Sequence, residues 1–260
     1  MELKEELLNP ELRKSNYNIL TSSGEEYSRI YHVHIRKCAG TSFNFKFIGN
    51  SCDHDPEAVR SIYQDTAKKG RSLFNGRVFC GWRKSLIESG KYFYAWSHIP
   101  FHELDLPQNT FTITTLRDPL QRLISHYKMI YGYYETQTNH PCMKVEGKWL
   151  GESKSIIEFA KNMPKEHLMA QLFHFSKSYS ETEAVDEIKK VNFTSEVEKL
   201  NSEGYRRLEK IIPSISLPNG KVRESSAISA LITKRDEEYL SELLEKEYRF
   251  LELLKNNVDP

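Results

Sequence analysis

The sequence has no long hydrophobic run and almost no net charge. No stretch approaches the roughly 18 apolar residues that read as a membrane-spanning helix. The first residues, MELKEELLNPELRKSN, are acidic and hold no apolar signal-peptide core. The formal net charge of +1 gives no reason to expect a nucleic acid or a membrane surface as a partner. We therefore expect a chain without a membrane span, cytoplasmic by default, that does not bind nucleic acid.

Cysteine is also scarce. The four cysteines, Cys38, Cys52, Cys80 and Cys142, form no CxxC pair and have no histidine at zinc-finger spacing. This pattern argues against a disulfide framework and against a metal site. We expect four free thiols, most of them buried as small hydrophobic side chains.

What the sequence does contain is an alternation of strand-like and helix-like segments. Hydrophobic periodicity predicts strands at residues 29–35, 91–96, 110–116 and 191–194. It predicts helices from Thr41 onward and at residues 56–69, 153–162, 165–175, 181–190, 202–211 and 234–255. A further helix should follow Asp118 as N-cap and Pro119 as first helical residue. This order predicts an α/β fold, a central parallel sheet flanked by helices, in one domain over residues 1–260. We expect residues 1–28 to form an N-terminal extension and residues 135–151 to form a loop insertion.

Three segments that follow predicted strands carry candidate chemistry. The first is RKCAGTS, residues 36–42. Its small residues, two hydroxyls and the amides of a helix start suit a phosphate, and Lys37 adds a mobile cation. The Walker A pattern is absent. Taken alone, this segment fits an ordinary strand–helix turn with a surface lysine equally well.

The second segment is LRDPLQRLISHY, residues 116–127. Arg117 ends a strand, and its planar guanidinium is suited to a bidentate phosphate contact. Ser125 lies about two helical turns further on, and Arg122 one turn before it, on the expected polar side. Taken alone, Arg117 and Asp118 also fit a structural salt bridge.

The third segment is WSHIPFHEL, residues 96–104, in which His98 directly follows a strand. A histidine there can act as a general base, because its unperturbed pKa lies near neutrality. A lone histidine is more often a packed or solvated residue, and His102 fits that description still better.

Together the three segments resemble the sulfotransferases that use 3′-phosphoadenosine-5′-phosphosulfate, particularly the branch that modifies carbohydrates. HVHIRKCAGTSF resembles their 5′-phosphosulfate loop, TITTLRDPLQRLISHY their 3′-phosphate motif, and SHIPF the segment with their catalytic histidine. VNFTSEVEKL resembles a late strand of this family more weakly, and EKEYRFLELL its closing helix. GKVRESSAI, around Arg223–Ser226, is a loose match to a late cofactor-contact loop.

Two positions depart from the family pattern. Arg36 stands where the family has proline, and Cys38 stands where it has a hydroxyl residue. The first change adds a second cation, and the second removes one side-chain donor. The backbone amides that would hold the phosphate are unaffected by either.

The resemblance implies a P-loop NTPase-like sulfotransferase fold and a set of roles. His98 would be the base that accepts the proton of the acceptor hydroxyl, and Lys37 would stabilise charge on the leaving phosphate. Contacts to the cofactor, with 3′-phosphoadenosine 5′-phosphate as its product form, would come from Lys37, Cys38, Ala39, Gly40, Thr41, Ser42, Arg117 and Ser125. No metal is required, since a sulfuryl group carries less charge than a phosphoryl group. The resemblance implies a hydroxyl-bearing acceptor, a glycan or a small glycoside, with Tyr133, Tyr134, His140 and Trp149 as a candidate wall.

Two other classes of function remain open from the sequence. A P-loop phosphotransferase would need a Walker A lysine beside Ser or Thr and a Mg²⁺-binding acid, and neither is evident. A non-catalytic nucleotide-binding module on the same fold is the other alternative. The presence of Lys37, His98 and Arg117 together argues against that second class.

Overall fold

The computed structural model describes residues 10–14, 16–218 and 232–257, which form two compact units. The first unit contains the described residues up to Ile35, residues 39–116 and residues 190–218. The second contains residues 36–38, 117–189 and 232–257.

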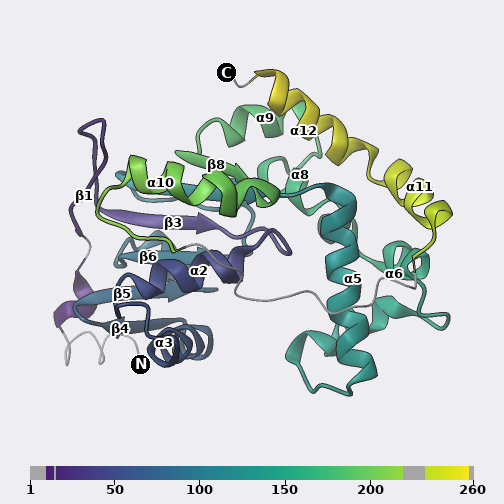
Figure 1. Cartoon of the computed structure of the whole chain (residues 1–260), viewed down its shortest axis with the longest axis horizontal. Helices are drawn as coiled ribbons and strands as arrows, with labels where there is room; N and C mark the ends of the chain where they lie inside the picture. Colours follow the sequence, from purple (N-terminus) through teal and green to yellow (C-terminus); the bar gives the residue numbers. More distant parts are fainter. Residues whose placement is uncertain (1–9, 15, 219–231, 258–260) are drawn as a thin grey trace. The chain divides into compact units, whose positions relative to one another are not determined.

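The first unit is built on a mixed, mostly parallel sheet of six strands (Figure 1). The strand order is β4-β5-β6-β3-β7-β8, and β4 runs antiparallel to β5 while the other pairs are parallel. The strands are β3 (Arg29–Val33), β4 (Arg71–Phe74), β5 (Arg77–Gly81), β6 (Tyr94–Ser97), β7 (Thr110–Leu116) and β8 (Phe193–Glu196). Sequence periodicity predicted β3, β6, β7 and β8, and the α/β class is confirmed. It did not predict β4 and β5.

The central strand β3 sets the register of the sheet. Val33 near its end pairs with Ser97 of β6 on one side and with Thr114 of β7 on the other. After β3 the chain continues toward β4 and β5, whereas after β7 it continues toward β8. The connections from these two neighbours thus leave in opposite directions. That is the topological switch point at which open α/β sheets bind their ligands.

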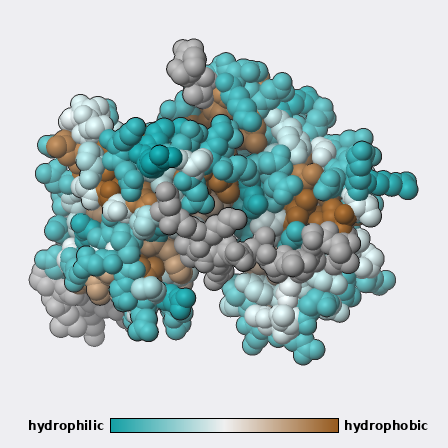
Figure 2. Space-filling view, in the orientation of Figure 1, coloured by the Kyte–Doolittle hydropathy of each residue, from teal (hydrophilic) through white to brown (hydrophobic). Residues whose placement is uncertain are grey.

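Three helices of the first unit cover one face of this sheet: α2 (Gly40–Gly49), α3 (Pro56–Lys69) and α10 (Tyr205–Ile211). Their apolar sides meet the strands in a core rich in rings, with Phe43, Phe47 and Trp96 fully buried. The outer side of α10 is hydrophilic in Figure 2. The smaller elements of the unit are η1 (Pro10–Arg13), β1 (Ile19–Leu20), β2 (Glu26–Tyr27), α4 (Lys84–Glu88), η2 (Phe101–Glu103), η5 (Val197–Lys199) and the π-helical turn η6 (Leu200–Gly204).

The second unit is helical. Its longest helix, α5 (Pro119–Glu135), begins as its sequence predicts: the Asp118 carboxylate accepts a hydrogen bond from the Gln121 N–H at 2.8 Å, and Pro119 is the first residue. The other elements are η3 (Pro141–Lys144), η4 (Glu146–Leu150), α6 (Ile156–Asn162), α7 (Lys165–Leu168), α8 (Ala170–Phe175), α9 (Glu181–Ile188), α11 (Lys234–Leu243) and α12 (Glu245–Asn257). Leu123, Trp149 and Phe159 belong to a core that α5, η4, α6 and α11 share. The predicted loop insertion at 135–151 therefore contains two short 3₁₀ helices.

The predicted single helix at 234–255 is wrong, because the segment forms two helices separated at the buried Leu244. The helices have different partners. α11 packs on α5 and α6, whereas α12 packs on α8 and α9. One straight helix could not direct its apolar stripe at both sets of neighbours, so the chain breaks between them.

The cysteines and the length of the helices were both addressed by the sequence predictions. All four cysteines are thiols outside any disulfide, as expected, and Cys38, Cys52 and Cys80 are buried. None of the described helices combines the length and apolarity needed to cross a bilayer.

Candidate functional site

The loop between β3 and α2 has an unusual backbone. Lys37 and Ala39 have φ angles of +67° and +59°, in the left-handed region, whereas Cys38 and Gly40 do not have positive φ. Alternation of left- and right-handed residues turns successive N–H groups toward one point and forms an anion-binding nest. Non-glycine residues occupy this region at a cost, and such strain concentrates at functional sites. The local geometry of residues 37–40 therefore suits an anion.

The start of α2 adds donors to this backbone. Gly40 is the first helical residue, Ala39 is the N-cap, and no side chain caps the helix. Thr41 and Ser42 lie in the first turn, and both are partly buried. Uncapped N–H groups together with the helix dipole favour a negatively charged group at this end.

Gly40 is required by packing as well. A Cβ atom at this position would lie 1.8 Å from Cδ2 of His34. The His34 ring therefore occupies the space that any larger residue at position 40 would need. The sequence suggested that a small residue here suits a phosphate. Contact with the His34 ring is a second reason for glycine at this position.

His98 follows β6 directly, as predicted, and its orientation is defined. The Ser97 hydroxyl accepts a hydrogen bond from the Ile99 N–H at 3.1 Å and shapes the turn. His98 Nδ1 lies 2.5 Å from the His34 carbonyl oxygen. Because a carbonyl only accepts, Nδ1 carries the proton and the lone pair resides on Nε2. This is the tautomer that a general base acting through Nε2 requires.

Rings hold His98 on two sides. Its centroid is 4.3 Å from that of His34 and 4.7 Å from that of Trp82. Both neighbours belong to the first unit, as do residues 39–42. The structure thus brings His98 and the start of α2 together through His34, a residue that sequence reasoning did not single out.

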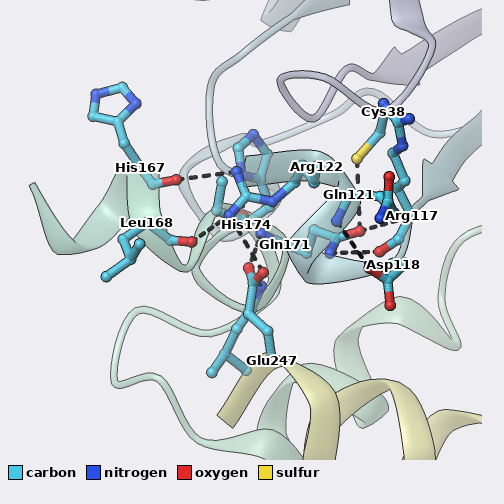
Figure 3. A network of polar contacts seen from close by, with 12 residues as sticks. Cys38, Arg117, Asp118, Gln121, Arg122, His167, Leu168, Gln171, His174 and Glu247 are labelled. Atoms are coloured by element: carbon cyan, nitrogen blue, oxygen red, sulfur yellow. Dashed lines mark hydrogen bonds and ion pairs between the residues drawn. The ribbon is translucent and has the colours of Figure 1, made fainter. Parts of the chain in front are cut away.

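Lys37, Cys38 and Arg117 come together in the second unit. Arg117 Nη1 donates to the Lys37 carbonyl at 3.2 Å. The Lys37 ammonium donates to the Met129 sulfur on α5 at 3.4 Å. Cys38 Sγ and the Arg117 N–H both point to Gln171 Oε1, at 3.6 and 2.7 Å (Figure 3). Two of the predicted phosphate ligands, far apart in sequence, are therefore in direct contact.

Arg122 differs from its prediction. It was expected on the polar side of α5, but its side chain is fully buried. It donates to the carbonyl oxygens of His167 and Leu168 and pairs with Glu247 at 3.4 Å (Figure 3). Arg122 is a structural residue of the second unit. Ser125, one turn further along α5, is partly buried.

Arg36, a departure from the family pattern, has a defined partner. Its Nη2 lies 2.7 Å from Glu146 Oε1, and His126 Nε2 lies 2.7 Å from the other oxygen of this carboxylate. Burial, assisted by Arg36 and other nearby cations, holds the pKa of His126 well below its usual value. Burial raises the pKa of Glu146, and Arg36 opposes that shift. The second cation of the loop is thus held by the 135–151 insertion.

The four residues of the candidate acceptor wall differ in their exposure. Trp149 belongs to the core of the second unit and is 5% exposed. Tyr133 and His140 stack with centroids 4.9 Å apart, and Tyr134 is exposed. Only the latter three have side chains open to a ligand. The late segment around Arg223–Ser226 lies outside the described residues.

The predicted site residues are shared between the units. Ala39, Gly40, Thr41, Ser42 and His98 belong to the first, and Lys37, Cys38, Arg117 and Ser125 to the second. In the described ranges, no three His, Cys, Asp or Glu side chains gather as metal ligands. Models of known protein families do not match this sequence, and a search of curated proteins finds no significant relative.

Proposed function

We propose that this chain is a sulfotransferase that transfers a sulfuryl group from 3′-phosphoadenosine-5′-phosphosulfate to an acceptor hydroxyl. The observation that carries the proposal is the alternating backbone of residues 37–40, which directly follows the central strand β3. A nest at the end of a central parallel strand is an arrangement suited to phosphate. The order of the motifs and the α/β class agree with a P-loop NTPase-like sulfotransferase fold, which is part of the same proposal.

The residues present fit an anionic cofactor. In this proposal the amides of residues 39–42 bind the 5′-phosphate, assisted by the Thr41 and Ser42 hydroxyls. Lys37, two residues before Ala39 in the chain, would supply an ammonium to the phosphate oxygen that becomes more negative during the reaction. Such preorganised charge acts on the transition state more than on the ground state.

The second phosphate is assigned to Arg117 and Ser125. Arg117 follows β7, the neighbour of β3 at the switch point, and its guanidinium carries donors in a planar fork. Arg117 Nη1 contacts the Lys37 carbonyl, so these two residues of the second unit lie together. The 3′-phosphate distinguishes this cofactor from ATP, so Arg117 also supplies selectivity.

His98 is assigned as general base. Its Nδ1–H is engaged by the His34 carbonyl, so Nε2 is the nitrogen that accepts a proton. The cofactor supplies the sulfuryl group, and His98 removes the proton from the acceptor hydroxyl as that oxygen attacks. The acceptor is proposed to be a carbohydrate hydroxyl, and the setting cytoplasmic.

Ligand binding and turnover test this proposal. Thermal unfolding of the wild-type protein should be measured with 3′-phosphoadenosine 5′-phosphate and, separately, with ATP and Mg²⁺. A ligand present at 100 times its Kd stabilises the folded state by about 2.7 kcal/mol. We expect a raised Tm with the first ligand and not with the second.

Transfer is then measured with ³⁵S-labelled cofactor and a panel of glycans and small alcohols. Labelled acceptor identifies an enzyme, whereas binding without turnover on any acceptor identifies a binding module. A raised Tm with ATP and Mg²⁺ alone would replace the proposal with a phosphotransferase.

A further inference from the structure

Gln171 lies at the centre of a buried polar network in the second unit (Figure 3). It sits in the first turn of α8, and its side chain is fully buried. Its Oε1 accepts from the Arg117 N–H at 2.7 Å, and its Nε2 donates to the Arg117 carbonyl at 2.9 Å. The side-chain amide therefore holds the peptide groups on both sides of Arg117, as a neighbouring strand would.

The same oxygen also reaches the loop that follows β3. The Cys38 thiol donates to Gln171 Oε1 at 3.6 Å, the distance of a weak sulfur hydrogen bond. Arg117 in turn donates from Nη1 to the Lys37 carbonyl at 3.2 Å. Gln171, Arg117 and residues 37–38 thus form a closed set of contacts.

Glu247 on α12 holds the backbone of Gln171 in place. Its Oε1 accepts from the N–H groups of Gln171 and Leu172, at 2.7 and 3.3 Å. Its Oε2 pairs with Arg122 at 3.4 Å, and both of these side chains are fully buried. A buried carboxylate with several charge-assisted partners has one favourable geometry, so it orients Gln171 strongly.

We propose that Gln171 is a positioning residue that clamps Cys38 to the backbone of Arg117 and thereby sets the affinity of the loop and Arg117 for an anionic nucleotide. This inference rests on the proposed function for the identity of that nucleotide. It also gives Cys38 a role: its thiol is the donor through which the loop meets Gln171. A removed clamp leaves each phosphate ligand present but lets their spacing vary, which weakens binding.

Accessibility of the Cys38 thiol tests the clamp without any ligand. Wild type, Gln171→Leu and Gln171→Glu are treated with N-ethylmaleimide, and labelling of each cysteine is followed by peptide mass spectrometry. We expect Cys38 to react at least about tenfold faster in Gln171→Leu, with Cys52 and Cys80 unchanged. Gln171→Glu keeps the acceptor for the Arg117 N–H and the thiol but loses the donor to the Arg117 carbonyl, so it should restore only part of the protection.

Asn192→Leu is the matched control. The Asn192 side-chain amide also accepts a backbone N–H of β7, that of Thr112 at 2.8 Å, but near the opposite end of the strand. We expect no change in Cys38 labelling for this variant. Equal labelling in Gln171→Leu and wild type overturns the inference, as does an equal increase in Asn192→Leu, because that increase reports general loosening.

Calorimetry with 3′-phosphoadenosine 5′-phosphate completes the test. We expect the Kd to rise about tenfold in Gln171→Leu and the KM for the cofactor to rise with little change in kcat. Gln171→Glu should recover only part of the loss, because it keeps the acceptor but not the donor of the amide. An unchanged Kd despite faster labelling overturns the link to binding. If wild type does not bind this nucleotide while labelling rises selectively at Cys38, the clamp is supported and the proposed function fails.

Discussion

The Arg36 guanidinium and the Glu146 carboxylate form an ion pair at 2.7 Å, with side chains 22% and 8% exposed. This contact joins the residue before Lys37 to the insertion at 135–151. Replacing Arg36 should therefore leave a largely buried carboxylate that keeps its contact with His126 but loses its guanidinium partner.

We expect Arg36→Met to lower the free energy of unfolding by about 2–3 kcal/mol, somewhat less than the roughly 3–5 kcal/mol for a fully buried pair. Urea unfolding at pH 7 measures it. The double variant Arg36→Met/Glu146→Leu should recover at least half of the loss, since no carboxylate is then stranded. Lys199→Met, which breaks an exposed pair with Glu196, is the control and should change little. A loss in Arg36→Met no larger than in this control would contradict the prediction.

Stability should fall with acid because of His32. Burial lowers the pKa of His32 from 6.5 to about 4, so the folded protein keeps the ring neutral while the unfolded chain protonates it. The contribution of neutral, buried His32 to the free energy of unfolding is fully present above the unfolded-state pKa of 6.5. It is lost as the pH falls toward the folded-state pKa of about 4. At pH 5 the loss from this group is about 2 kcal/mol.

The slope of unfolding free energy against pH between 5 and 7 measures this effect. His32→Gln should flatten the slope. Buried His126 acts in the same direction, because its pKa is also lowered, so a residual slope is expected. The His32 prediction fails if its variant keeps the wild-type slope.

Loss of the proposed base should separate turnover from binding. His98→Ala removes the proton acceptor, so the rate should fall by about 10²–10⁴. Affinity for 3′-phosphoadenosine 5′-phosphate should stay nearly unchanged, because the phosphate ligands remain. Single-turnover kinetics and calorimetry provide the two readouts, with His102→Ala as the neighbouring control. Near-normal turnover in His98→Ala would remove histidine from this role.

Arg117 should matter for binding more than for turnover. A hydrogen bond to a charged group contributes about 1.5–3 kcal/mol, so Arg117→Ala should weaken binding of 3′-phosphoadenosine 5′-phosphate by about 10–100-fold. Arg117→Lys keeps the charge without the planar fork and should be intermediate. Gln121→Ala, at an exposed position on the first turn of α5, is the control. Equal calorimetric affinity in wild type and Arg117→Ala would overturn the assignment.

Gly40 offers a test of packing at the start of α2. Gly40→Ala places a methyl group against the His34 ring, so one of them must shift, at a cost of about 1–3 kcal/mol for overpacking. His34→Ala removes the obstructing ring, and the double variant should be more stable than the sum of the single effects predicts. Urea unfolding of the four proteins closes the cycle. Simple additivity would show that His34 is not what excludes a side chain at position 40.

Local signals made much of the fold predictable. The boundary between β7 and α5 was predicted to the residue, because Asp118 and Pro119 are strong local start signals. The β4–β5 hairpin was missed although its signal was present. Asn75 and Gly76, with φ of +46° and +69°, are the Asn-Gly pair typical of a tight hairpin turn.

Long-range partners were not predictable in this way. The burial of Arg122 depends on Glu247, and the position of Gln171 depends on Arg117 and Cys38. No periodicity connects such residues, and a single glutamine in a short helix carries no signal of its own. The break at Leu244 was not predictable for a related reason. An apolar stripe indicates that one side of a helix is buried, but it does not indicate how many neighbouring helices bury it.

The central position of β3 also has a consequence for synthesis. Ile30 pairs with Tyr94 and with Phe111, so the first partner of the middle strand leaves the ribosome about sixty residues after it. At about 5–20 residues per second, the strand waits several seconds without a neighbour. β4 and β5, joined by a tight turn, can pair much sooner. The strand that carries the candidate loop is therefore made before its neighbours in the sheet, and it has no partner until β6 follows.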